Sequence, residues 1–150
     1  MRAIHVLEAS DARAMVEAAR HAAASHGDGQ GPARVSLAVV DGGGHLLLFE
    51  RLDGASPASS ETAIAKARMA ALNGKATADQ ERSINGERPA LLQLAGIFGQ
   101  PAVAMGGGIP LLIEGDCLGA IGVSGMTPTT DLAIAEAAAM AFTNLLEAQS

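Results

Sequence analysis

Apolar positions recur along the first third of the chain in two different rhythms, and each rhythm predicts a different element. Between Ser10 and Gly27 the apolar residues return every three or four positions, which is typical of a helix with one buried face. Ser10 and Asp11 are both favoured N-cap residues, and the glycines from Gly27 onward end the helical pattern. The stretches Val35–Val40 and His45–Arg51 are apolar almost throughout and are joined by glycines. We therefore expect a β-hairpin in a sheet that is covered on both faces.

The remainder of the chain alternates helical and strand patterns with no linker long enough to divide it. Turn and cap residues such as Gly74, Glu114–Asp116 and Thr127–Pro128 mark where elements begin and end. We expect a helix over Ser59–Asn73, an irregularly helical stretch over 77–98, a hairpin of Ile109–Ile113 with Cys117–Val123, and a last helix with a buried seam of Leu132, Ala135, Ala139, Phe142 and Leu146. Two hairpins between helices predict an α+β fold, with helices packed on an antiparallel sheet, in one domain over residues 1–150.

Composition and charge argue against several classes of function. Hydrophobic residues make up 49% of the chain, yet no run reaches the roughly eighteen apolar residues of a membrane span. Met1–Glu8 lacks the apolar core of a signal peptide, so we expect a cytoplasmic protein without membrane contact. A net charge of −6, with three Phe and no Trp or Tyr, leaves little with which to bind nucleic acid. The single cysteine, Cys117, lies in an apolar strand pattern, where a buried and inert thiol is the usual case.

Two glycine-rich segments, Met105–Pro110 and Gly119–Gly125, belong to the second predicted hairpin. Backbone without Cβ atoms lets a ligand approach closely, and successive exposed N–H groups suit an anion. The second segment leads into a helix at Pro128, whose N-terminus favours negative charge. The alternative is that the glycines serve only tight packing of the sheet and the helices. We expect these segments to form one wall of a small-ligand site, with contacts from Gly107, Gly108, Ser124 and Gly125.

Charged side chains are the candidates for further ligand contacts, and we expect Arg51, Asp53 and Lys66 to line the same pocket. Arg51 ends an apolar strand, where it can pair with a ligand carboxylate or form a structural pair with Asp53 or Asp41. Lys66 lies among apolar residues in mid-helix, where it can point inward to an anion or extend to solvent. The candidates for proton transfer are Asp41, Asp53, Glu61 and Lys66, although the same groups can equally form a structural ring around the loops.

Five blocks of sequence occur in an order that covers nearly the whole chain: Val39–Leu46, Phe49–Ala55, Ile64–Ala67, Gly107–Pro110 and Gly119–Gly125, the last followed by Asp131. The ordered set resembles the GlcG/HbpS family, which is also known from the C-terminal domain of PduO-type proteins and is often described as haem-binding or haem-degrading. The resemblance implies a profilin-like or PAS-like sandwich, in which a five-stranded antiparallel sheet carries helices on both faces. It also implies a homo-oligomer that binds a small anion or haem, with haem as the expected cofactor.

The four histidines offer few ligands for a metal ion. His21 and His26 are five residues apart on one helix and point about 140° away from each other, so they cannot share a metal. No spacing of His, Cys and carboxylates matches a zinc site. The family resemblance implies a weak axial ligand near the first helix, which makes His21 the expected haem-iron ligand and His26 the second choice. As alternatives, His26 can cap the end of its helix and His21 can pair with Glu17 on the surface.

Three functions from different classes agree with these residues. The first is a cytoplasmic haem-binding protein with a glycine-rich pocket that contains Arg51 and Lys66, and this is our prediction. The alternative is a lyase, hydratase or isomerase that acts on an organic acid, because the same pocket suits a small carboxylate equally well. The third is a structural oligomer in which the alanine and glycine faces serve assembly alone.

Overall fold

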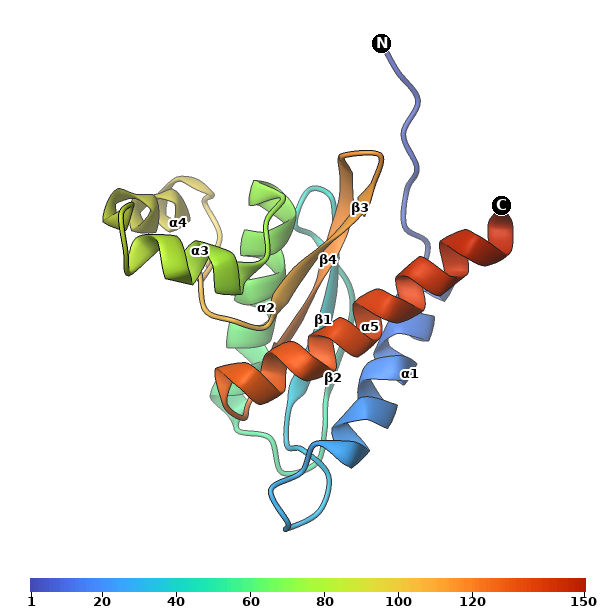
Figure 1. Cartoon of the computed structure of the whole chain (residues 1–150), viewed down its shortest axis with the longest axis vertical. Coiled ribbons are helices and arrows are strands. Elements are labelled where there is room, and N and C mark those ends of the chain that lie inside the picture. The colour runs from blue at the N-terminus through green and yellow to red at the C-terminus, as the bar shows by residue number, and fades with distance from the viewer.

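The chain forms a twisted sheet with helices on both sides (Figure 1). In the computed structural model, which describes residues 1–150, the first half contains α1 (Ala9–Ser25), β1 (Ser36–Asp41), β2 (Leu46–Arg51) and α2 (Pro57–Asn73). The second half contains α3 (Thr77–Ile84), the 3₁₀-helix η1 (Pro89–Gln93), α4 (Leu94–Ile97), β3 (Gly108–Ile113), β4 (Asp116–Ser124) and α5 (Pro128–Gln149). Every predicted element is present, and the irregularly helical stretch predicted over 77–98 consists of α3, η1 and α4.

The sheet has four strands in the order β2-β1-β4-β3, and each neighbouring pair is antiparallel. The family resemblance implies five strands, and this expectation is therefore wrong by one strand. Residues 98–107, which precede β3, form no strand, and part of this stretch lies against α2. There the amide of Val103 donates to the carbonyl oxygen of Ala65 at 3.3 Å. As a result, β2 and β3 are the two edges of the sheet.

Alternate side chains of the central strands point to opposite faces of the sheet. Leu37 and Val39 of β1 face α1 and α5, where the core holds large side chains such as Met15. The expected cover on both faces is confirmed for β1 but wrong for the edge strand β2, whose Leu46 and Leu47 are 45% and 36% exposed. The reason is that α2 lies mainly over β4 and β1. The core beneath α2 is built almost entirely of alanine: Ala38, Val40, Ala63, Ala67, Ala70, Ala71 and Ala120.

Local capping explains where the helices begin and end. α1 begins one residue before Ser10, because Asp11 stabilises the first turn from inside by accepting the amide of Glu8 at 2.8 Å. α2 begins two residues earlier than predicted because Ser56 is its N-cap residue. Its predicted end is confirmed, since Gly74 adopts a φ of 66° in the left-handed region that glycine favours.

The last helix begins as predicted, directly after the N-cap residue Thr127. Its predicted seam is confirmed in part, because Leu132, Ala139 and Leu146 are only half-buried, although Ala139 and Leu146 still pack against the core. Ala135 and Phe142 of the predicted seam are buried in the core as expected, and the other buried side chains of the helix are Asp131, Ile134 and Ala138. Leu132 lies on the side of α5 that faces α3.

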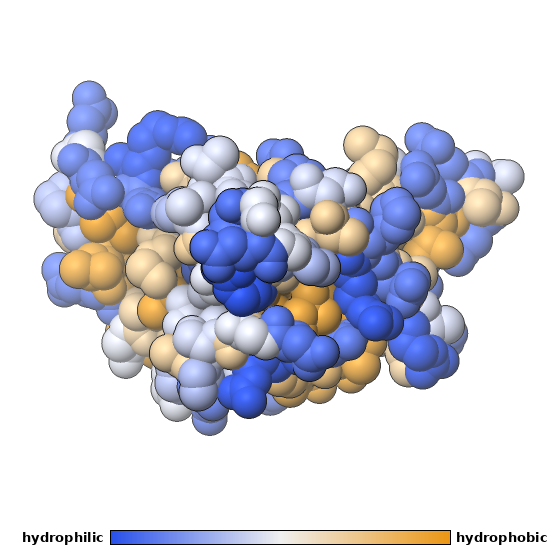
Figure 2. All heavy atoms as spheres, turned by 90° about the horizontal axis from the view of Figure 1, so that it is seen from below, coloured by the Kyte–Doolittle hydropathy of each residue, from blue (hydrophilic) through white to orange (hydrophobic).

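None of the helices combines the length and the hydropathy needed to cross a bilayer. The surface nevertheless carries apolar side chains, and Figure 2 shows them in separate patches between hydrophilic ones. Three of the most exposed large apolar residues are Leu92, Ile97 and Met140. These patches are surfaces on which a ligand or a second chain can bury apolar area.

Candidate functional site

Three of the predicted contact residues lie at one end of the sheet. Ser36 of β1 is the register partner of both Arg51 in β2 and Ser124 in β4. Gly107 lies at the same end, because its carbonyl oxygen accepts the amide of Val123 at 2.9 Å. The structure thus places Arg51, Ser124 and Gly107 along one end of the sheet, but none of the hollows described below is lined by them.

Lys66 points inward from α2 and is only 3% exposed. Its Nζ donates to the carbonyl oxygen of Val123 at 2.9 Å and to Oδ2 of Asp131 at 3.1 Å. The other carboxylate oxygen of Asp131, Oδ1, accepts the amide of Met126 at 3.0 Å. The buried ion pair therefore joins α2, the end of β4 and the first turn of α5.

Asp131 was missed as a site residue by sequence analysis, where it appears only at the end of a sequence block. Two signals point to it in retrospect. A carboxylate in the first turn of a helix lies at the positive end of the helix dipole. A lysine directed into the core also requires a counter-charge, because an unpaired buried charge is very costly.

The predicted glycine wall packs against the protein's own atoms. A Cβ atom at Gly108 would lie 2.8 Å from Cγ2 of Thr77, and it would overlap the carbonyl oxygen of Lys66. Gly107 has a φ of 129°, and a Cβ atom there would lie 3.1 Å from Nζ of Lys66. Gly125 likewise faces main-chain atoms. Tight packing accounts for the absence of side chains at these positions, and ligand contact by these glycines stays a prediction.

The remaining charged candidates do not form one cluster. Arg51 is exposed and forms no ion pair, so the alternative of a structural pair with Asp53 or Asp41 is absent. Oδ1 of Asp41 accepts two backbone amides of the β1–β2 turn at 2.9 and 3.0 Å, so this carboxylate stabilises the turn. Asp53 lies at the opposite end of that hairpin, and Glu61 is exposed on α2. The proton-transfer roles of Asp41, Asp53, Glu61 and Lys66 stay predictions.

Asp53 belongs to a hollow of about 420 Å³ beside the C-terminal end of α1. The hollow contains two arginines, and both already have carboxylate partners. Arg20 Nε lies 3.4 Å from Glu50, and Arg34 Nη2 lies 2.8 Å from Asp28. The hydrogen bond from Arg34 lowers the pKa of the Asp28 carboxyl and raises the pKa of Arg34. The lining residues are Arg20, Ala24, Gln30, Pro32, Ala33, Arg34, Leu52 and Asp53.

The histidines remain on the surface. His21 is exposed on α1, and His26 forms a hydrogen bond between its Nδ1 and the carbonyl oxygen of Ala22 at 2.8 Å, which supports its alternative role at the helix end. Neither His21 nor His26 lines a described hollow. No group of three or more His, Cys, Asp or Glu side chains is placed to hold a metal ion. The expected ligation of haem iron by His21 or His26 stays a prediction.

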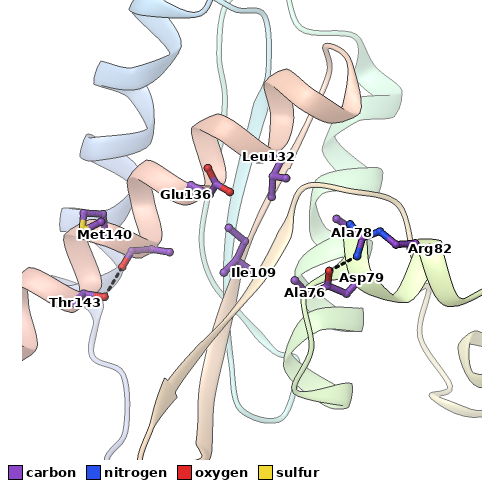
Figure 3. A pocket seen from close by; sticks show the side chains of 10 residues that line it. Ala76, Ala78, Asp79, Arg82, Ile109, Leu132, Glu136, Met140 and Thr143 are labelled. Carbon is purple, nitrogen blue, oxygen red and sulfur yellow. Dashed lines mark hydrogen bonds and ion pairs between the residues drawn. The ribbon is translucent and has the colours of Figure 1, made fainter.

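A groove of about 530 Å³ runs between α3 and α5, with β3 between them (Figure 3). This volume lies within the range of roughly 300–1,000 Å³ that is common for small-molecule sites. Ile109 and Leu132 point into it from β3 and α5, and Arg82 of α3 forms an ion pair with Asp79 at 2.8 Å on its rim. The lining residues are Ala76, Ala78, Asp79, Arg82, Ile109, Leu132, Glu136, Ala139, Met140 and Thr143.

The groove adjoins the glycine wall and the buried ion pair, because Ile109 follows Gly108 and Leu132 follows Asp131. The fold and these features define a class: a small α+β protein with a two-sided antiparallel sheet and an apolar groove beside a buried lysine–aspartate pair. The family model described as "Haem degrading protein HbpS-like" matches residues 7–140. The chain belongs to this HbpS-like family, which confirms the resemblance found in its sequence.

Individual relatives are similar over different lengths. Protein GlcG of Escherichia coli K12 is 37% identical over 90 residues, which are 60% of this chain and 63% of GlcG. The chain thus spans less than two thirds of that relative. The crystal structure of a double mutant of Streptomyces reticuli HbpS is 30% identical with a TM-score of 0.79, over 93% of this chain and 89% of that one. A crystal structure of PduOC in complex with haem is 28% identical with a TM-score of 0.77, over 91% and 95% of the two chains.

Proposed function

We propose that this protein binds haem and that the groove between α3 and α5 holds it. The observation that carries the proposal is the groove itself, a hollow of about 530 Å³ in which six of the ten lining residues are hydrophobic. Further support comes from the family description and from the haem complex of PduOC, whose fold covers nearly all of this chain. The glycine wall that sequence analysis placed in the ligand site borders this groove through Gly108 and Ile109.

The lining of the groove fits the chemistry of haem in three respects. The porphyrin ring requires apolar walls, which Ile109, Leu132 and Ala139 supply. The propionates require a cation, and Arg82 is the arginine in the groove. A methionine thioether can bind haem iron, and Met140, which is 60% exposed, is the methionine in the groove wall that would do so.

The chain's own residues have separable tasks in this proposal. Arg82 and Asp79 are 75% and 65% exposed, and an exposed ion pair is weak, so Arg82 can exchange its carboxylate partner for a propionate. Leu132 and Ile109 would exclude water from the ring, and Met140 would hold the iron through its sulfur. When bound, haem supplies redox and oxygen chemistry that no side chain in the groove offers.

We expect the purified protein to bind one haem per chain, with a Soret band that saturates in a titration. Met140→Leu keeps the length of the side chain and removes the sulfur, so it should change the position of the Soret band while the ring still binds. Leu132→Glu places a charge against the ring and should weaken binding roughly tenfold or more. Absorption spectroscopy and titration with iron-free protoporphyrin, followed by fluorescence, separate the two effects.

His21→Ala is the matched control, because His21 is the ligand expected from the family resemblance and lies outside the groove. If His21→Ala alters the band and Met140→Leu does not, haem binding stands but the ligation moves to α1. A titration without a saturable Soret band contradicts haem binding altogether.

A small organic acid is the second candidate ligand, and the observation that favours it is the free guanidinium of Arg51 at the end of the sheet. If Arg51 holds a carboxylate, Arg51→Ala is expected to weaken its binding by about 1.5–3 kcal/mol, the range for hydrogen bonds to charged groups. Calorimetry with succinate as the probe measures this loss. Arg13→Ala is the control, because Arg13 is also exposed and forms no ion pair. Equal affinity of the wild type and Arg51→Ala removes Arg51 from the site.

A further inference from the structure

The charged side chains of the groove between α3 and α5 are divided between its two walls. Arg82 and Asp79 belong to α3, where they form an ion pair at 2.8 Å. Glu136 belongs to α5 and lies across the groove from them, with Ile109 of β3 between the two walls (Figure 3). Glu136 is exposed and forms no ion pair within the chain. The groove therefore has a cation on the α3 wall and an unpaired carboxylate on the α5 wall.

Glu136 lies in the middle of the α5 wall. Leu132 precedes it by four residues and Met140 follows it by four, and both line the groove as well. Residues at this spacing lie above one another on one face of a helix, so the carboxylate belongs to the face that a ligand would cover. The sequence of α5 contains no Lys, Arg or His. A negative group that enters on this side would thus meet a like charge that no cation of α5 neutralises.

The charge of the whole lining limits how a carboxylate ligand can be placed. Two carboxylates, of Asp79 and Glu136, stand against the one guanidinium of Arg82, which is a net charge of −1. Because this net charge repels a free dianion, a ligand with carboxylates gains affinity only where it presents them to Arg82. The rest of that ligand lies towards α5, where the apolar neighbours of Glu136 favour an edge without charge.

Porphyrins differ in where their carboxylates are attached. Protoporphyrin, the ring of haem, has its propionates on one edge and apolar vinyl groups on the opposite edge, whereas coproporphyrin has propionates around the whole ring. We propose that Glu136 determines which porphyrins the groove accepts, because it repels a ring that carries a carboxylate on the edge facing α5. The propionate edge of haem then lies at α3, beside Arg82. This inference rests on the proposed function and extends it from haem binding to selection among porphyrins.

The test is a titration of the purified protein with haem and with iron coproporphyrin, followed through the Soret band. Both ligands carry the same iron, so the comparison isolates the groups at the edge of the ring. The wild type should bind haem at least about tenfold more tightly than iron coproporphyrin, which corresponds to about 1.4 kcal/mol. High salt should reduce this preference, because ions screen a repulsion between exposed charges.

Glu136→Gln keeps the size of the side chain and removes its charge. It should reduce the preference for haem over iron coproporphyrin by about fivefold or more, since the repulsion at the α5 wall is lost. Glu147→Gln is the matched control, because it removes the same charge from an exposed position of α5 that lies outside the groove. This control should leave the preference unchanged. Circular dichroism shows whether each variant retains its fold.

The outcomes separate this inference from the proposed function. If the wild type binds haem and iron coproporphyrin equally well, the inference is wrong and haem binding stands. The same conclusion follows if Glu136→Gln leaves the preference unchanged, or if Glu147→Gln reduces it as much as Glu136→Gln does. In the latter case the selection depends on the net charge of the protein rather than on the groove. A protein that binds neither ligand contradicts the proposed function, and the inference fails with it.

Discussion

Asp131→Asn is expected to lower the free energy of unfolding by about 3–5 kcal/mol, the range for breaking a buried ion pair from one side. The substitution keeps the volume of the side chain and an oxygen that can accept the amide of Met126. It leaves the ammonium of Lys66 without a counter-charge at a position that is 3% exposed. Stabilities of small domains are about 5–15 kcal/mol, so this single change removes a large share of the total. Urea denaturation followed by circular dichroism measures the loss.

The matched control is the double substitution Lys66→Gln with Asp131→Asn. It replaces the buried charges by two amides that can still form a hydrogen bond, so it should recover part of the stability lost in Asp131→Asn. Because Lys66 and Asp131 are in direct contact, the effects of the single substitutions should not add. A double variant that is less stable than Asp131→Asn contradicts the role of Asp131 as the counter-charge.

Gly122→Ala is expected to destabilise the fold by about 1–3 kcal/mol through overpacking. A Cβ atom at Gly122 of β4 would overlap the carbonyl oxygen of Ala63 and lie 2.7 Å from the amide nitrogen of Ala67. Both atoms belong to the main chain of α2, so neither can rotate away, and the helix must move off the sheet. The cost should therefore fall at the upper end of that range, and thermal unfolding with calorimetry measures it.

Gly96→Ala is the control for this substitution. A Cβ atom at Gly96 would meet nothing within 4 Å, and the residue lies in the short helix α4. Alanine restricts the unfolded chain more than glycine does, so Gly96→Ala should be neutral or stabilise the protein by up to about 1 kcal/mol. Equal stability of Gly122→Ala and the wild type would show that α2 does not depend on close contact with the sheet.

The elements were predictable because their boundaries depend on neighbouring residues. Gly74 ends α2 through its own φ, and the turn before β4 uses positive φ at Glu114 and Gly115, so a local pattern is enough to find both. The pattern of the chain also predicts the four strands that are present, and the fifth strand was implied only by the family resemblance. The contact of Val103 with Ala65 of α2 is a different case, because these two residues lie far apart in the sequence and no local pattern connects them.

In the candidate site, too, some features can be predicted from a local pattern and others depend on contacts between distant residues. A lysine among apolar residues is enough to single out Lys66 as a candidate. Its partner Asp131 lies 65 positions further along the chain, so no local pattern connects the two residues. The groove combines side chains of α3, β3 and α5, and α3 belongs to the least regular stretch of the sequence pattern. Leu132 was assigned to the core because its spacing fits a buried seam. Leu132 lines the groove instead, while its neighbour Asp131 is buried in the ion pair with Lys66.

The contrast between the two faces of the sheet bears on how this sequence can change over time. On the face of α1 and α5, large aliphatic side chains can be exchanged for one another, because neighbours can compensate for a change in shape. On the face of α2, alanine and glycine already have the smallest side chains, so nearly every substitution adds volume. Substitutions in the core should therefore accumulate mainly on the side of α1 and α5, whereas the side of α2 should retain small residues.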